Sequence, residues 1–423
     1  MGRFIYNCFM PLVFLFFLPK LIIKYRSRGG WKDTYGERFA RFGIRTEELK
    51  EFRGAIWIHA VSVGETIVAL TMIRRYLERF PERRFVISTT TTTGQDVARS
   101  NLPDNTTVIF CPLDFPWMVR RALDLLRPSQ LVIFETEIWP NLISLAEKRN
   151  IPVSLINGRL SDKSARGYRR MKLFFAPLLN KFDQILAQSD SDAARFLSVA
   201  PKAAVRNGGN LKFDQKLPVL DSENILRPYI GDGTVLLAGS THPGEEELIV
   251  RCFKELKTQF PELKLVIVPR HAERGKDIAM MLEYEKCSCV RRSVKGFPDE
   301  KVDVLLADTT GEMLNFMKDA DIVIMGKSFA GHDEGHNLIE PALLAKPVVT
   351  GTVLRNFRYL LNIMNEAGAV VTADDESLSG VLRDLLADPE KRRALGQKAC
   401  SVIGANGGAV DRAVEAIESL MKK

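Results

Sequence analysis

The sequence predicts an α/β protein built from two doubly wound domains with parallel sheets. Short runs of β-branched and aliphatic residues are repeatedly followed by a glycine or hydroxyl-bearing turn and then by a helical pattern, as βαβ units require. The 423 residues, 46% of them hydrophobic, exceed what one hydrophobic core usually organises. A polar stretch marked by proline and glycine separates the two series of strands at residues 215–233, which we interpret as a linker.

The first domain element is a hydrophobic anchor with a basic collar, expected at residues 1–30. Residues 4–24 are almost wholly apolar and lack a small-residue cleavage site, so a retained membrane anchor is expected instead of a secretory signal peptide. Between Lys20 and Arg45 there are eight Lys/Arg residues against two acidic ones, which suits an anionic cytoplasmic leaflet. A bilayer span needs roughly 20 residues, so a tilted span and an interfacial helix both remain open. A solvated basic surface without a partner is the alternative explanation of the collar.

Composition argues against two other classes of protein. The six cysteines show no framework of regular spacings, which indicates a reducing compartment. The formal net charge is +8, but neither zinc-ligand spacing nor a basic helix nor aromatic-basic interleaving accompanies it. No nucleic acid is therefore expected as a partner.

Buried parallel strands are expected throughout residues 31–214, the first Rossmann-like domain. Between them lie amphipathic stretches, such as residues 67–80, that predict helices. The expected strands are residues 55–61, 84–90, 106–111, 131–136, 153–158 and 184–189.

A second Rossmann-like domain is expected at residues 234–423, after the linker at 215–233. Packing of its last helix on the first domain is left open. Doubly wound sheets bind ligands at the carboxyl ends of their strands, so the expected site is a central cleft between the domains. The strands expected here are residues 234–240, 264–270, 302–308, 320–326 and 346–351.

The segment GHDEGHNLIEPALLAKP, residues 331–347, contains two of the five histidines. His332 and His336 stand four apart, as in the zinc-binding HExxH pattern. However, the glutamate is third instead of second and two glycines disfavour a helix. We therefore expect a strand-to-helix loop and no metal site.

The same loop contains a helix-start signal. Asn337 and Glu340 have the capping-box spacing, which predicts a helix beginning at Asn337. The N-terminus of such a helix would bind an anion, and Gly335 would allow a phosphate to approach closely. Mutual capping of Asn337 and Glu340 without any ligand explains the same residues.

Other strand ends in this half carry small, hydroxyl-bearing or cationic residues. Ser240 and His242 follow one strand, Arg270 and His271 follow the next, and Gly311 precedes a helix. A nucleotide phosphate with its base and ribose is the kind of ligand that uses such groups. Neither GxGxxG nor GxxxxGK[ST] occurs, which disfavours a dinucleotide or a P-loop site.

Charged residues also follow strands in the first half. Glu65 is expected at a helix N-terminus, where the dipole favours the ionised carboxylate that a general base needs, although an acid there also stabilises the helix by roughly 0.3 to 1 kcal/mol. Glu135 and Glu137 follow a buried strand and are hard to explain by packing. Lys212 and Arg159 add cations to the expected cleft.

At these residues the chain resembles the 3-deoxy-D-manno-octulosonic acid (Kdo) transferases of lipopolysaccharide synthesis, which have the GT-B fold. The motifs that carry the resemblance run nearly end to end in the family's order: SVGE, ETEIWPN, INGRLSDKS, QSDSDAARF, GNLKFD, AGSTHPGEE, VPRH, DTTGEM and GHNLIEP. The resemblance implies an enzyme at the cytoplasmic face of the inner membrane that moves Kdo from CMP-Kdo to a lipid A precursor such as lipid IVA. It also implies inversion at the anomeric carbon, with no metal and no other cofactor.

The resemblance implies a role for each matching residue. Glu65 corresponds to the general base, and Glu135 and Lys212 to transition-state stabilisers. Residues at three strand ends correspond to the CMP site: Pro269, Arg270, Gly311, Glu312, Met313, Asn337, Leu338, Ile339 and Glu340. Further candidates for lining the cleft are Ser240, His242, His271, Gly335, His336 and Arg159.

This chain departs from the family pattern at two glycine pairs. Glu334 precedes Gly335 and Lys327 follows Gly326, where the family usually has paired glycines. An acid beside a phosphate is expected to weaken donor binding unless it points away, and Lys327 would compensate.

Two other functions are alternatives to the transferase. A nucleotide-sugar epimerase of the same fold would not need a lipid-facing anchor. A non-catalytic membrane-bound nucleotide-binding module would leave Glu65, Glu135 and Lys212 unexplained.

Overall fold

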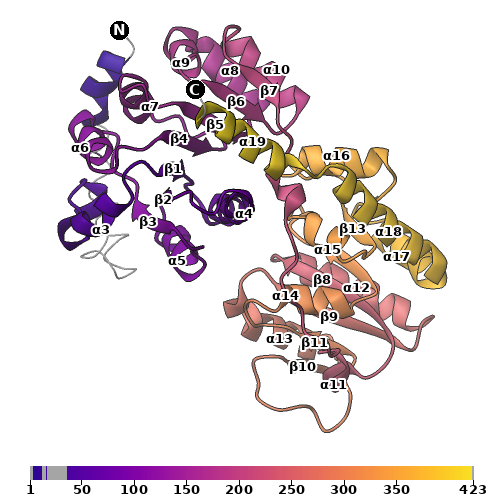
Figure 1. Ribbon diagram of the computed structural model, residues 1–423. Coiled ribbons are helices and arrows are strands. Elements are labelled where there is room, and N and C mark those ends of the chain that lie inside the picture. The colour runs from indigo at the N-terminus through magenta and orange to yellow at the C-terminus, as the bar shows by residue number, and fades with distance from the viewer. Residues whose placement is uncertain (1–2, 12–15, 17–35, 422–423) are drawn as a thin grey trace. The chain divides into compact units, whose positions relative to one another are not determined.

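The computed structural model describes residues 3–11, 16 and 36–421. The chain divides into two compact units, Met1–Gln215 with Asn406–Lys423, and Lys216–Ala405. Each unit contains a seven-stranded sheet whose strands all pair in parallel (Figure 1). The expected α/β class with two Rossmann-like domains is therefore confirmed.

The sheet of the first unit contains the six strands that the sequence predicts and one more at its edge. Its helices lie between successive strands, as in βαβ units. The strands are ordered β3 (Thr106–Phe110), β2 (Phe85–Thr89), β1 (Ile56–His59), β4 (Gln130–Phe134), β5 (Val153–Gly158), β6 (Gln184–Ala187) and β7 (Val205–Asn207). The helices are η1 (Gly43–Arg45), α3 (Thr46–Glu51), α4 (Val63–Arg79), α5 (Thr92–Ser100), α6 (Pro116–Leu126), α7 (Pro140–Glu147), α8 (Asp162–Arg170), α9 (Lys172–Leu179), α10 (Asp190–Val199), η2 (Leu211–Asp214) and α19 (Ala409–Met421).

The sheet of the second unit contains the five predicted strands and two short ones at its edges. The segment predicted as a linker, residues 215–233, includes one short helix of this unit. The strands are ordered β10 (Cys289–Arg291), β11 (Val304–Leu306), β9 (Leu263–Pro269), β8 (Thr234–Thr241), β12 (Ile322–Met325), β13 (Val348–Gly351) and β14 (Val371–Ala373). The helices are α11 (Arg227–Ile230), α12 (Glu245–Lys257), η3 (Ala272–Arg274), α13 (Gly275–Tyr284), α14 (Met313–Asp319), α15 (Ile339–Leu343), α16 (Arg358–Glu366), α17 (Leu378–Ala387) and α18 (Pro389–Ala405).

Strand β1 shows why the predicted strands are continuously apolar. Trp57 belongs to the hydrophobic cluster on one face of the sheet, and Ile56 and Ile58 belong to the cluster on the other face. All four residues of β1 are buried. A parallel sheet covered on both faces needs apolar residues at consecutive positions, because successive side chains point to opposite faces.

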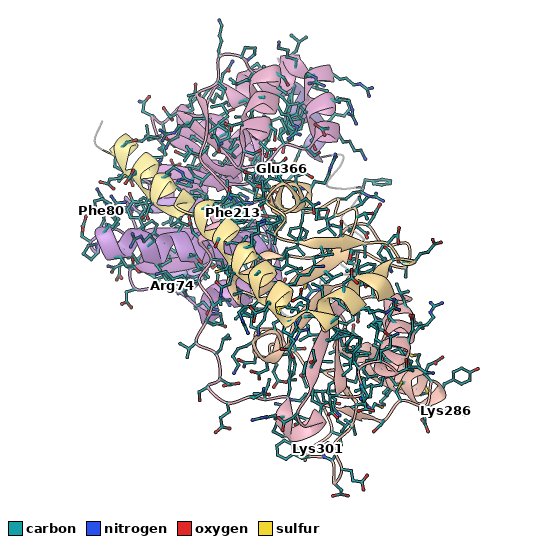
Figure 2. The ribbon with its side chains drawn as sticks, turned by 90° about the vertical axis from the view of Figure 1, so that its right-hand side faces the viewer. Arg74, Phe80, Phe213, Lys286, Lys301 and Glu366 are labelled. Carbon is teal, nitrogen blue, oxygen red and sulfur yellow. The ribbon has the colours of Figure 1, made fainter. Side chains whose placement is uncertain are left out.

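Helix α19 completes the first unit although it ends the chain. It packs against α4, where Arg74 on the helix and Phe80 just after it are labelled in Figure 2. The Glu418 carboxylate, which is buried, accepts hydrogen bonds from the Tyr76 hydroxyl at 2.5 Å and the Arg83 guanidinium at 2.7 Å. Asp214 accepts from two backbone N–H groups at the start of α19. The last helix is thereby joined to the first domain.

Each sheet has one point where the chain order reverses direction. In the first unit this point lies between β1 and β4, and in the second unit it lies between β8 and β12. Loops that leave neighbouring strands at such a point diverge to opposite faces and open a crevice that ligands use. The loops after these four strands are therefore where functional residues are expected.

The expected membrane anchor lies mostly outside the described residues, because residues 12–15 and 17–35 are not described. Residues 3–11 are helical, and their Tyr6 ring lies 6.3 Å from the ring of Phe174 in α9. Asn7 accepts a 2.7 Å hydrogen bond from Asn141 at the start of α7. No helix within the described part of the chain is long and apolar enough to cross a bilayer.

Candidate functional site

Glu65 lies in the first turn of α4, directly after β1. Ser62 is the N-cap, and its hydroxyl oxygen accepts the Glu65 N–H at 3.3 Å. In return the Glu65 carboxylate accepts the Ser62 hydroxyl at 2.8 Å and the Val61 N–H at 2.9 Å. This reciprocal arrangement is a variant of the capping box, in which the carboxylate accepts the N–H of the residue before the N-cap. It places a buried carboxylate at the crevice end of β1.

The helix dipole, which favours the ionised form of Glu65, is opposed by the burial of the carboxyl group. Burial raises the pKa of Glu65 to about 7, and the negative charges of Glu135 and Glu137 act in the same direction. The N–H of Val61 and the hydroxyl of Ser62 lower the pKa, but by less than burial raises it. A carboxyl group with a pKa near 7 can both take up and release a proton at neutral pH, as acid–base catalysis requires.

Glu135 and Lys212 form an ion pair at the same switch point. Glu135 directly follows β4 and has a left-handed φ of 54°. Its carboxylate lies 3.3 Å from the Lys212 ammonium, and both side chains are partly exposed. Lys212 is in η2, whose first N–H is accepted by the side chain of Asn157 at the end of β5. The structure therefore places Glu65 and Glu135 at the ends of neighbouring strands, and η2, which follows the edge strand β7, brings Lys212 to Glu135.

Two aromatic groups beneath these carboxylates were not predicted from the sequence. The indole N–H of Trp139 donates to Glu137 at 3.1 Å. The ring of His59, the last residue of β1, is wholly buried and lies edge-on to Trp139 at 5.4 Å. Burial lowers the pKa of His59 to about 4, so its ring is neutral. A histidine at the end of an apolar strand does not by itself distinguish a site residue from a core residue, so no signal in the sequence identifies His59.

Arg159 is exposed in the loop after β5. Its backbone carbonyl accepts a hydrogen bond from the hydroxyl of Thr136, which lies between the two carboxylates that follow β4. The structure therefore places the Arg159 backbone, but no described contact of its side chain, beside this group.

In the second unit, one carboxylate organises the loops after β8 and β12. Glu245 is completely buried at the start of α12. Its two oxygens accept four backbone N–H groups at 2.8 to 3.0 Å, those of His242, Lys327, Ser328 and Phe329. The loops on either side of this switch point are thus held by a single side chain.

Four of the five histidines gather at these strand ends. The His242 ring lies 6.0 Å from that of His271, 5.6 Å from that of His332 and 5.3 Å from that of His336. Burial, and then the positive charge of Arg270, lower the pKa of His336 to about 4. Among the described residues, no three His, Cys, Asp or Glu side chains are placed so that they could hold a metal ion.

Arg270 is the exposed cation of this group. It follows Pro269, the last residue of β9, and its backbone N–H donates to the Thr241 carbonyl at 3.0 Å. Its positive charge opposes the effect of burial, which raises the pKa of Glu340. Arg270 therefore lies near both Glu340 and His336. Ser240 ends the neighbouring strand with a φ of 57° and is partly exposed.

The turn from Gly311 to Met313 leads into α14. Gly311 is exposed with a φ of 93°, and a side chain there would meet open space. The Glu312 carboxylate is bound by Arg292 at 2.6 Å and by the Thr309 hydroxyl at 2.5 Å. The hydrogen bond from Arg292 is the largest of the effects that lower the pKa of Glu312. Because this carboxylate is held in an ion pair, Gly311 is the part of the turn that a ligand can approach most closely.

The helix predicted to begin at Asn337 begins two residues later. Helix α15 runs from Ile339 to Leu343, and its N-cap, Leu338, makes no side-chain cap. Asn337 instead accepts the Ile339 N–H at 3.2 Å, because an asparagine side chain can close a turn with the backbone two residues ahead. The predicted capping box is therefore wrong, although Asn337 does bond the Glu340 carboxyl.

Gly335 is required by its own surroundings. Its φ is 72°, and a Cβ atom there would lie 2.4 Å from the Leu354 side chain. Its N–H donates to the Lys327 carbonyl at 2.7 Å. Backbone conformation and packing against Leu354 thus explain the glycine without a bound phosphate.

Two family descriptions match the chain. Residues 33–215 match the 3-deoxy-D-manno-octulosonic-acid transferase (kdotransferase) family, and residues 245–402 match the glycosyl transferases group 1. The 3-deoxy-D-manno-octulosonic acid transferase of Haemophilus influenzae is 31% identical over 100% of both chains. That of Bordetella pertussis is 32% identical over 99% of both chains.

Solved structures with the same architecture are more distant in sequence. A putative UDP-N-acetylglucosamine 2-epimerase from Listeria monocytogenes has a TM-score of 0.59 at 14% identity, covering 88% of this chain and 97% of the other. The UDP-GlcNAc 2-epimerase from Neisseria meningitidis has a TM-score of 0.57 at 15% identity, covering 87% and 100%. At these identities the likeness concerns the fold alone. The full-length sequence matches are the evidence for family, and the chain therefore belongs to the 3-deoxy-D-manno-octulosonic acid transferases, glycosyltransferases with two Rossmann-like domains of the GT-B type.

Proposed function

We propose that this enzyme moves Kdo from CMP-Kdo to a lipid A precursor, lipid IVA, with inversion at the anomeric carbon. The full-length relatives named Kdo transferases support the transferred sugar. The buried Glu65 at the β1 switch point is the single observation that best supports the mechanism. The epimerase alternative has weaker support, because the epimerase structures share only the fold with this chain.

Glu65 is the proposed general base. Its carboxylate takes the proton of the attacking acceptor hydroxyl as the bond to the anomeric carbon forms. One displacement from the face opposite the departing CMP inverts the configuration. The pKa of about 7 suits this role, because a base works best when its pKa lies near the working pH.

Glu135 and Lys212 are the proposed stabilisers of the transition state. Departure of CMP from a keto-sugar leaves an oxocarbenium-like centre, which the Glu135 carboxylate would stabilise. The Lys212 ammonium, 3.3 Å from that carboxylate, would hold it in position and balance developing negative charge. Preorganised charges of this kind need little rearrangement during the reaction.

The second unit is the proposed CMP site. Arg270 offers an exposed guanidinium at the end of β9, and guanidinium groups bind phosphates well. The exposed Gly311 and the turn at Asn337 lie at neighbouring loops and offer backbone groups to the nucleotide. Glu340 is the proposed ribose partner. No metal or other cofactor is part of the proposal.

The cytoplasmic face of the inner membrane is the proposed location. Exposed apolar side chains in the N-terminal helix support it: Phe4 is 74% exposed and Phe9 61% exposed. Beside this helix, α9 exposes Leu173 by 89%. An enzyme whose acceptor carries acyl chains works at the bilayer surface, and apolar side chains flanked by basic ones favour an anionic leaflet.

Transfer assays with Glu65→Gln test the proposal. Wild-type protein, CMP-Kdo and lipid IVA in vesicles are expected to release CMP only when acceptor is present. Glu65→Gln keeps the size and the hydrogen-bonding shape of the side chain but cannot take a proton, so kcat is expected to fall by about 10² to 10⁴-fold. Its affinity for CMP, measured by calorimetry, is expected to stay the same.

Two controls belong to this experiment. Glu51→Gln, on the exposed end of α3, is expected to keep full activity. Acceptor-independent release of CMP by the wild-type protein would contradict transfer, and loss of CMP binding in Glu65→Gln would assign Glu65 a structural role.

A further inference from the structure

Lys327 has a backbone conformation that disfavours a side chain. Its φ is 60°, in the left-handed region, which costs a residue other than glycine roughly 1 to 2 kcal/mol. Its N–H donates to Glu245 at 2.8 Å and its carbonyl accepts the Gly335 N–H at 2.7 Å. Residues held in such conformations by their surroundings concentrate at functional sites. The groups around the Lys327 side chain therefore bear on its role.

The same bonds place Lys327 beside His242. One oxygen of Glu245 accepts both the Lys327 N–H and the His242 N–H, each at 2.8 Å. Between these loops there is no room for a further atom, since a Cβ on Gly326 would lie 2.6 Å from the Ser240 carbonyl oxygen. Lys327 and His242 therefore leave adjacent backbones at the switch point between β12 and β8.

Several side-chain nitrogen atoms near Lys327 have no hydrogen-bond partner in the described part of the protein. Within the described residues, neither the Lys327 ammonium nor the Arg270 guanidinium forms an ion pair or a side-chain hydrogen bond. The Nδ1 atom of His242 and the Nε2 atom of His336 are buried, and no protein group bonds to them. Two side-chain cations and two buried imidazole nitrogens at these strand ends are thus left without a protein partner among the described residues.

The same groups act on one another electrostatically. Burial, and then the positive charges of His332 and Lys327, lower the pKa of His242. Both Arg270 and Lys327 lower the pKa of His336, against the opposite effect of Glu334. Nearby Glu245 and Glu246 are occupied, the first by four backbone N–H groups and the second by Arg274 at 2.7 Å. The local excess of positive charge therefore favours an anion.

The proposed donor carries two anions on neighbouring atoms. In a nucleotide-linked 2-keto sugar acid, the carboxylate and the phosphate oxygen are both bonded to the anomeric carbon. Two cationic groups side by side, one for each anion, would suit such a donor, and Lys327 adds one where the family usually has glycine. We propose that the Lys327 ammonium, with His242 beside it, binds the carboxylate of the sugar acid, while Arg270 binds the phosphate. This assignment rests on the proposed function and adds a residue that selects an acidic sugar.

Replacing Lys327 by glycine removes the ammonium and suits the left-handed φ, so the fold is expected to be kept. Its kcat/KM for CMP-Kdo is expected to fall at least about tenfold, since a hydrogen bond to a charged group is worth about 1.5 to 3 kcal/mol. CMP, which lacks the sugar carboxylate, is expected to bind Lys327→Gly within about twofold of wild type in calorimetry. Lys327→Arg keeps the charge and is expected to recover most of the loss.

Lys286 supplies a matched control. It is an exposed lysine with a φ of 57° in the same unit, labelled in Figure 2 and distant in sequence from the site. Lys286→Gly makes the same change in a turn after α13, and neither kcat/KM nor CMP affinity is expected to change. Thermal unfolding of both glycine variants is expected to occur at or above the wild-type temperature.

The outcomes separate this proposal from the proposed function. If CMP affinity and kcat/KM fall equally in Lys327→Gly, the ammonium binds the phosphate and the carboxylate assignment is wrong. An unchanged kcat/KM would show that Lys327 does not contact the donor. If the wild-type protein neither binds CMP nor transfers Kdo, the proposed function itself fails, whatever Lys327 does.

Discussion

At the scale of single residues, Glu65 combines a structural and a chemical task. Its carboxylate closes the capping box with Ser62 and is also buried near Glu135 and Glu137. Capping alone would favour the ionised form, whereas burial favours the protonated form. The second effect is the larger one here, because the pKa is raised. Motif spacing could place Glu65 at the helix start, but burial depends on the folded surroundings and could not be read from the sequence.

The pH dependence of transfer is expected to follow Glu65. Below its pKa of about 7 the carboxyl holds a proton and cannot accept another, so kcat/KM is expected to rise about tenfold per pH unit and level off above pH 7. In Glu137→Gln one negative charge that raises this pKa is lost, while the Trp139 N–H still finds an acceptor. The rising limb is therefore expected to move to lower pH. Profiles recorded from pH 5 to 9 measure the shift.

The exposed Glu82, in the turn after α4, provides the control for this profile. Glu82→Gln is expected to leave the limb where it is in the wild type. A limb that moves to higher pH in Glu137→Gln would contradict the electrostatic argument.

Asn337 and His59 show which site residues sequence patterns could not assign. The spacing of Asn337 and Glu340 matched a capping box, yet Asn337 closes a turn and α15 begins at Ile339. Both arrangements suit an asparagine followed by a carboxylate, and only the burial of Leu338 separates them. His59 occupies an apolar strand, where a histidine signals neither a site nor a core position by itself.

At the scale of elements, the strands with apolar runs were predictable, including the edge strand β3, and the other three edge strands were not. All eleven predicted runs contain a strand. The missed strands β7, β10 and β14 are three residues long and contain mainly partly or fully exposed side chains. An edge strand is buried by neighbours on one side only, so its sequence does not need the continuous hydrophobic run that identifies a central parallel strand.

Helices α8 and α9 form a second candidate contact with lipid. Lys163, Arg166 and Arg170 on α8 are exposed and make no ion pair among the described residues. Leu173 on α9 is almost fully exposed. Reversing the charge of Arg166 and Arg170 is expected to weaken binding to anionic vesicles, because each basic residue near such a surface contributes about 1 kcal/mol. Co-sedimentation with anionic and with neutral vesicles measures the loss.

A matched apolar pair tests the same surface. Leu173→Asp is expected to reduce vesicle binding, whereas Leu197→Asp on α10, where the leucine is 38% exposed, is expected to leave it unchanged. Equal losses in the two variants would point to general destabilisation instead of a lipid-contacting surface.

At the scale of the whole molecule, the chain contributes both of its ends to one unit. Val410, Val414 and Ile417 of α19 are buried in a hydrophobic cluster of the first unit. Sequence analysis allowed a last helix that packs back, but its partner α4 could not be identified, since pairing of segments more than 300 residues apart leaves no local signal.

Removing residues 406–423 is therefore expected to unfold the first unit. Each buried aliphatic side chain lost costs about 2 to 5 kcal/mol, and domains are stable by only about 5 to 15 kcal/mol. The second unit loses no residue, so CMP binding is expected to persist in the truncated protein. Limited proteolysis, with fragments identified by mass spectrometry, is expected to show cleavage within residues 36–215. Cleavage confined to residues 216–405 would contradict this division of the chain.

The shared use of both chain ends has a consequence during synthesis. Protein domains usually fold in the order in which the ribosome releases them. Here residues 216–405 are released as a complete unit before the helix that completes residues 1–215. The part of the polypeptide made first is thus the part that matures last, and nascent chains are expected to depend on chaperones until α19 has left the ribosome.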